Sequence, residues 1–65
     1  MKVYCVFECY ENGYPEDREC KLIKIFDSNI KAQNFINEQN ANGHFYIDEK
    51  YDCSLTGQIV EMEVY

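Results

Sequence analysis

Long apolar runs are missing from this chain of 65 residues, and basic side chains are scarce. No stretch approaches the ~20 apolar residues of a membrane-spanning helix, so no membrane segment is expected. Six Lys and Arg stand against twelve Asp and Glu, which leaves a net charge of −6. Because DNA and RNA are held by clustered basic side chains, direct nucleic-acid binding is not expected.

Groups that could carry catalysis are also sparse. His44 is the only histidine, and the three glycines form no phosphate-cradling loop. The acids gather at residues 16–19 and 48–52 without the spacing of a calcium loop. An enzyme needs a cleft in which several polar groups converge, and no motif here predicts one. We therefore expect neither an enzyme nor a cofactor.

Four cysteines raise the possibility of a metal site or a disulfide. Cys5 and Cys9 fall in one predicted strand and lie about 13 Å apart, too far to share a metal ion. Cys9 and Cys20 face each other in the predicted hairpin and could form a cross-strand bridge. The first residues contain Glu8 and no small-residue cleavage site, so no signal peptide is expected. The expected location is the cytoplasm, where thiols stay reduced.

Size and composition predict a single domain over residues 1–65, with one core. Alternating apolar residues predict strands over 2–10 and 19–26, separated by a turn over 11–17. Ser28 is the predicted N-cap of a helix. Ala32, Phe35, Ile36 and Gln39 form a stripe at helical spacing with Ile30 at its edge, and the helix is predicted to end at Asn42-Gly43.

Alternation returns over 44–52 and 58–65, with a turn predicted over 54–57. The fold class is therefore α+β: an antiparallel sheet of about four strands in the order ββαββ, with one helix packed on one face.

The register of the first hairpin can be predicted from side-chain matching. With partner numbers that sum to 29, Cys9 faces Cys20 and Glu8 faces Lys21 as an opposite-charge pair. The remaining apolar pairs in this register are Phe7 with Leu22, Val3 with Phe26, Val6 with Ile23, and Tyr4 with Ile25. Only Cys5 opposite Lys24 is a poor match.

One helix can cover only one face of this sheet. The face expected beneath it carries Val3, Phe7, Leu22, Phe26, Ile47, Val60, Met62 and Val64. The opposite face would display Tyr4, Val6, Tyr10, Ile23, Ile25, Tyr46 and Ile59. Because a small monomer rarely exposes such a patch without using it, this face is predicted to form a homodimer or to capture a partner protein.

The N-terminal part of the chain also carries a resemblance. Residues 1–8 (MKVYCVFE), 22–26 (LIKIF) and 27–36 (DSNIKAQNFI) resemble a group of small uncharacterised ββαβ-type proteins of phages and low-GC bacteria. Their pattern is a first strand of the type VYVV, then a second strand ending in Phe, then S-x-x-x-K-A-x-x-F/Y-I. The resemblance covers about the first 40 residues. It implies a fold and an origin, but no functional residue.

Two hypotheses of function follow. The leading one is a small acidic, non-catalytic interaction protein, encoded by a phage or mobile element, that modulates or inhibits a host protein such as a defence protein. The alternative is a homo-oligomer that binds or sequesters a small ligand such as a nucleotide signal. In that case tyrosines would stack on the ligand. The scarcity of Lys and Arg counts against phosphate binding, although Lys21, Lys24 and Lys50 could converge.

Overall fold

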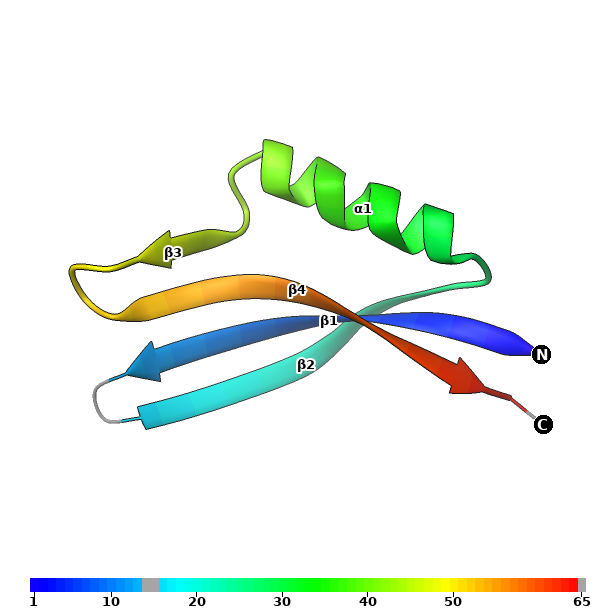
Figure 1. Ribbon diagram of the computed structural model, residues 1–65, viewed down its shortest axis with the longest axis horizontal. Coiled ribbons are helices and arrows are strands. Elements are labelled where there is room, and N and C mark those ends of the chain that lie inside the picture. Colours follow the sequence, from blue (N-terminus) through cyan, green and yellow to red (C-terminus); the bar gives the residue numbers. More distant parts are fainter. Residues whose placement is uncertain (14–15, 65) are drawn as a thin grey trace.

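The computed structural model describes residues 1–13 and 16–64. These form strands β1 (Lys2–Gly13) and β2 (Glu16–Phe26), helix α1 (Asn29–Ala41), and strands β3 (Tyr46–Asp48) and β4 (Cys53–Glu63). The strands make one antiparallel sheet in the order β2-β1-β4-β3 (Figure 1). The predicted α+β class and ββαββ order are confirmed. Tyr14 and Pro15 of the predicted first turn lie outside the described residues.

Helix α1 begins and ends where its sequence predicts. Ser28 is the N-cap in an extended conformation, although its side chain makes no capping hydrogen bond. Asn42 is the C-cap, and Gly43 follows with a φ of +78°, a conformation that glycine adopts without strain. Ala32 is fully buried, whereas Ile30 at the edge of the stripe is 73% exposed.

The predicted hairpin register is confirmed on the turn side of Phe7, where Cys9 pairs with Cys20 and Phe7 with Leu22. It is wrong on the other side, because the pairing shifts between Val6 and Phe7. Ile23 is the extra residue of this bulge, so Val6 pairs with Lys24 rather than with Ile23. A bulge turns every later side chain of its strand to the opposite face of the regular register.

The bulge removes the one poor match of the regular register. Cys5 now pairs with Ile25 instead of Lys24. Lys24 moves to the other face, where its ammonium lies 5.6 Å from the ring centre of Phe26 and 5.4 Å from that of Phe35. An apolar neighbour for Cys5 and a cation–π position for Lys24 both favour the bulged register.

The second half of the chain differs from the prediction in its turn. The turn lies at residues 49–52 rather than 54–57, so β3 is short and β4 begins at Cys53. Gly57 therefore lies within β4 instead of in a turn. A Cβ on Gly57 would lie 2.8 Å from Cζ of Phe45 and 3.4 Å from Cγ1 of Ile36. The missing side chain provides the space into which Phe45 and α1 pack.

Helix α1 covers the face of the sheet opposite to the predicted one. It contacts β1, β2 and β4, and Phe35 packs on Phe26 with ring centres 5.5 Å apart. Phe26 pairs with Tyr4, so Tyr4 and Val6 lie on the helix side, and Val6 is fully buried. Of the residues expected beneath the helix, those now placed on the other face by their pairing are Val3, Phe7, Leu22, Ile47, Val60 and Met62.

Candidate functional site

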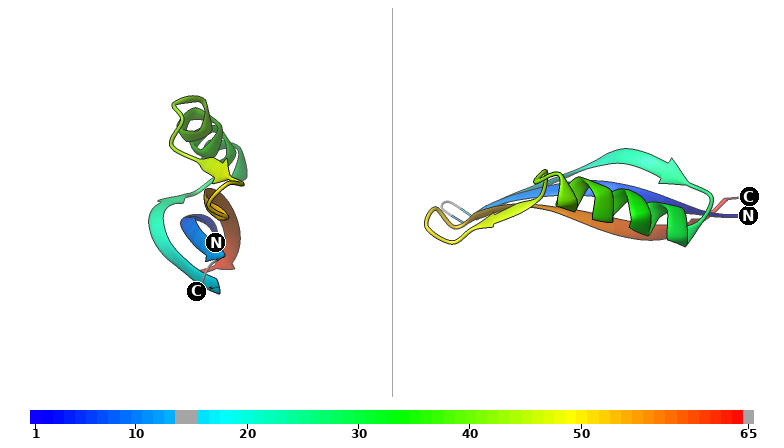
Figure 2. Two further views of the ribbon diagram at one scale, coloured as in Figure 1. Left: turned by 90° about the vertical axis from the view of Figure 1, so that its left-hand side faces the viewer. Right: turned by 90° about the horizontal axis from the view of Figure 1, so that it is seen from above.

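The face of the sheet that turns away from α1 is the candidate functional surface. Figure 2 shows α1 on one side of a strongly twisted sheet, and among the described residues no helix or strand covers the other side. We call this surface the open face. Its apolar side chains outside the disulfide, placed by strand pairing, are Val3, Cys5, Phe7, Leu22, Ile25, Ile47, Val60 and Met62.

Phe7 of the open face is partly buried, whereas several of the aliphatic side chains around it are exposed to solvent. Leu22 is 48% exposed, Ile25 53% and Met62 49%. Ile25 and Val60 both pair with Cys5, one from each neighbouring strand, and leave Cys5 only 3% exposed. The Met62 Sδ atom lies 3.6 Å from the Cys5 Sγ atom. The result is an apolar surface with Cys5 at its floor and longer side chains around it.

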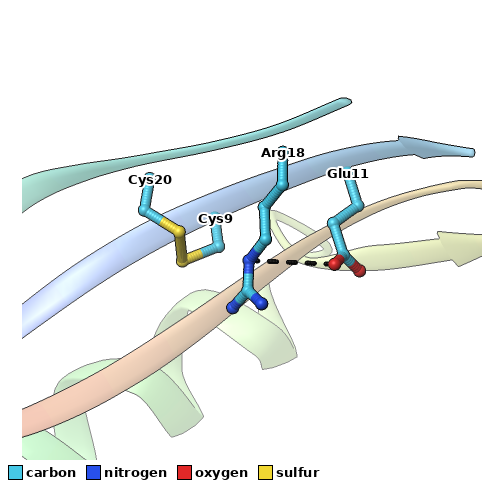
Figure 3. Close-up of a disulfide and its surroundings, with 4 residues drawn as sticks. All are labelled: Cys9, Glu11, Arg18 and Cys20. Carbon is cyan, nitrogen blue, oxygen red and sulfur yellow. Dashed lines mark ion pairs between the residues drawn. A yellow bond between two sulfur atoms is a disulfide. The ribbon is translucent and has the colours of Figure 1, made fainter. Parts of the chain in front are cut away.

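A disulfide between Cys9 and Cys20 adjoins this apolar surface and joins β1 to β2 (Figure 3). Their Cα atoms are 4.1 Å apart, close to the ~4.5 Å of a non-hydrogen-bonded antiparallel pair. The pairing of Cys9 with Cys20 is confirmed. The expectation that their thiols stay reduced is wrong, because the two sulfur atoms are bonded. Cys5 and Cys53 are free cysteines.

Charged side chains of the described strands are segregated between the two faces. On the open face, Arg18 and Glu11 form an ion pair of 3.7 Å beyond the disulfide, on the same side of the strands (Figure 3). The charged residues described on the helix side, as strand pairing places them, are Lys2, Glu8, Glu19, Lys21, Lys24, Asp48, Glu61 and Glu63. The apolar part of the open face therefore carries no charge of its own.

Lys2 and Glu61 illustrate the exposed charge pairs of the helix side. The Lys2 ammonium lies 3.0 Å from a Glu61 carboxylate oxygen, and this hydrogen bond raises the pKa of Lys2 above its ordinary value. Both side chains are more than half exposed, so the pair is screened by solvent and adds little to stability.

The seven side chains predicted to form one interaction surface do not share a face. Tyr4, Val6, Tyr10, Tyr46 and Ile59 lie on the helix side, Ile23 lies in the bulge, and Ile25 alone lies on the open face. Val6 is 0% exposed and cannot contact a partner. Gly57 is the sequence signal that could have identified the covered face. Because Gly57 has no side chain, the face of β4 on which it lies leaves room for Phe45 and for Ile36 of the helix.

His44 and Glu8 connect the end of α1 to the sheet. The His44 Nε2 atom lies 2.5 Å from Glu8 Oε1, and Lys21 Nζ lies 3.9 Å from Glu8 Oε2. The His44 backbone N–H also donates to the Gln39 carbonyl at the helix end. The Glu8 side chain is only 13% exposed, and burial of a carboxylate is unfavourable unless polar partners surround it. His44 and Lys21 supply those partners. This arrangement supports a structural role for His44.

A hollow lined by several acidic side chains lies where the β3–β4 turn meets the end of β1. These acids include Glu11, Asp48, Glu49 and Asp52. The Asp48 carboxylate is engaged within the turn, where it accepts hydrogen bonds from the N–H groups of Lys50 and Tyr51. Among the described residues, no group of three His, Cys, Asp or Glu is arranged to hold a metal ion. Within the same described part of the chain, no helix has the length and apolar character needed to cross a membrane.

A third feature is a shallow, mainly apolar cleft of about 410 Å³ between α1 and strands β3 and β4. The aromatic rings of Phe45 and Tyr46 and the amides of Asn37 and Asn40 line it. Partial desolvation raises the pKa of Tyr46, with smaller contributions from Cys53, Tyr10 and Asp48. The phenol therefore stays neutral at physiological pH.

Comparison of the chain with models of known protein families, with curated protein sequences and with solved structures yields no match. The resemblance to small phage and low-GC bacterial proteins therefore stays a prediction from the residues that carry it.

Proposed function

We propose that this chain is a small, non-catalytic protein-interaction module that binds through its open face. The supporting observation is the contiguous apolar surface of Leu22, Ile25, Val60 and Met62, whose side chains are between 43% and 53% exposed. Buried centres of protein interfaces are apolar and depleted of charge, and this surface has both properties. A solvated sheet face ordinarily carries polar side chains instead.

The distribution of charge over the molecule bears on which partner could bind the open face. The net charge of the chain is −6, but the charged strand residues described on the open face are the paired Glu11 and Arg18, so a partner at its apolar part meets little charge. In the form suggested by the resemblance, the partner is a host protein that the module modulates or inhibits, for example one of a defence system.

The proposal is tested by comparing affinity-tagged variants in a lysate of a low-GC bacterium. Leu22→Lys and Val60→Lys place a charge on the open face, and Ile30→Lys places one at an exposed position of α1. We expect proteins retained by the unsubstituted chain and by Ile30→Lys to be lost from both open-face variants. Retention that is unchanged in the open-face variants would contradict binding through this surface.

The cleft beside Phe45 supports the second candidate function, the binding of a small ligand. Its rings and amides suit a planar, uncharged heteroaromatic group better than a phosphate, because no Lys or Arg lines it. The three lysines that could have converged on a phosphate are engaged separately: Lys21 near Glu8, Lys24 over Phe26 and Phe35, and Lys50 over Tyr51.

Saturation-transfer NMR with adenosine and with AMP tests whether the cleft prefers an uncharged nucleoside or a phosphorylated nucleotide. We expect any signal to be at least as strong for the nucleoside as for the nucleotide, and to fall in Phe45→Leu. A strong preference for AMP would contradict the assignment to this cleft.

A further inference from the structure

The molecule has more surface than a compact domain of its length. Its accessible surface is 5012 Å², whereas a folded chain of this size exposes about 4,300 Å². The excess of about 700 Å² is close to the ~800 Å² that each partner contributes to a standard protein–protein interface. The excess area of one copy is therefore similar to the area that contact with one folded partner would remove from solvent.

The shape of the molecule leads to the same conclusion. Its extents are 41 × 25 × 12 Å and its radius of gyration is 13.2 Å, against about 11 Å for a compact domain of this length. Helix α1 lies against one face of the sheet, and no other helix of the described residues lies against the second face (Figure 2). Stable domains pack the apolar face of each sheet against another layer, and residues 1–13 and 16–64 of one chain supply no such layer on the open face.

Burial is also divided between the two faces. Among residues whose burial is described, those that are buried are Val6 and Ala32 on the helix side, and Cys5 and Cys9 on the open face. Cys5 and Cys9 are small side chains in the central strand, so the open face has a shallow floor between the longer side chains of β2 and β4. Such relief allows side chains of an opposing sheet to interdigitate, as they do in two-layer β structures about 10 Å apart.

We propose that the partner on the open face is a second copy of this chain, which forms a closed two-fold dimer with the two sheets face to face and the two helices outside. This inference rests on the proposed function and names the partner of the same surface. A two-fold interface uses one patch on both copies, so a self-complementary apolar patch needs no second binding surface. The arrangement also keeps the acids of the helix side outside the interface, where solvent screens their repulsion.

Sedimentation equilibrium of the oxidised full chain tests the dimer at neutral pH over a range of concentrations. We expect the unsubstituted chain and Ile30→Lys to be dimers at micromolar concentration. Leu22→Lys and Val60→Lys should raise the dimer Kd by at least about tenfold, the effect of losing one central interface contact. A monomer at high micromolar concentration, or a dimer equally stable in both open-face variants, would overturn the inference.

Two further readouts keep the result interpretable. Circular dichroism verifies that each Lys variant is folded, and the dilution series of the unsubstituted chain needs no variant at all. If the chain is monomeric but loses a lysate protein in the open-face variants, the dimer is wrong while the proposed binding function stands. If open-face substitution alters neither self-association nor the retained proteins, both are wrong.

Discussion

At the scale of single residues, Gly57 decides which face of the sheet the helix can cover. Its Cα hydrogen leaves room for the Phe45 ring and Ile36, both of which would be in contact with a Cβ at that position. Apolar residues lie on both faces of β1, so alternation in that strand favours neither face. A side chain that is missing from one strand therefore carries more information about the packing than the many that are present.

We expect Gly57→Ala to destabilise the fold by about 1–3 kcal/mol, because the added methyl group forces Phe45 or the helix to move. Urea denaturation measures the free energy of unfolding. In a Phe45→Leu background the cost of Gly57→Ala should fall, since the group closest to the new Cβ has been removed. An equal cost in both backgrounds would show that Phe45 does not pack against Gly57.

The disulfide gives the second prediction at this scale. Thiol titration in denaturant should find two free thiols before reduction and four afterwards, since only Cys5 and Cys53 are unpaired. Reduction should lower the free energy of unfolding by up to about 3 kcal/mol, the loop-closure effect for a separation of 11 residues. Cys53→Ser serves as the control, with an unchanged response to reductant. Four thiols before reduction would contradict the bridge.

At the scale of elements, the bulge in β2 decides which side chains face the helix. Regular alternation would place Lys24 beside Cys5 on the apolar face, whereas the extra residue Ile23 turns Lys24 toward Phe26 and Phe35. The same shift moves Ile25 to the open face. One inserted residue thus changes the chemical character of both surfaces.

Two single-residue deletions test this role of the bulge. Deletion of Ile23 restores regular pairing and leaves Lys24 and Ile25 on their present faces. Deletion of Ile25 also restores regular pairing but turns Lys24 toward Cys5. We expect the second deletion to be less stable than the first by about 1–3 kcal/mol, the cost of partly desolvating an unpaired polar group. Equal urea midpoints for the two deletions would contradict the assigned register.

Local patterns predicted the elements better than their packing. The helix ends at Ser28 and Asn42, the pairing of Cys9 with Cys20 and the element order all follow from caps, spacing and side-chain matching. The covered face did not follow, because it depends on Gly57 within β4 and on a bulge that alternation does not reveal. As a result, Val60 and Met62 were expected in the core and instead lie on the candidate surface.

At the scale of the whole molecule, stability should depend on concentration. If the open face is covered by a second copy, unfolding separates the two chains, so mass action favours the folded dimer at higher concentration. Each tenfold increase in protein should add about 1.4 kcal/mol per mole of dimer. The urea midpoint of the unsubstituted chain should rise accordingly, while that of Leu22→Lys stays constant. A midpoint independent of concentration in both would indicate that each folds as a monomer.

The most direct test of the open face as the interaction surface is a dilution series followed by methyl NMR. Methyl groups of Leu22, Ile25 and Val60 report on the open face, and those of Ile30 and Ile36 report on the helix side. We predict that the first group shifts with protein concentration and that the second does not. Shifts confined to Ile30 and Ile36, or methyl signals that are all independent of concentration, would contradict self-association through the open face.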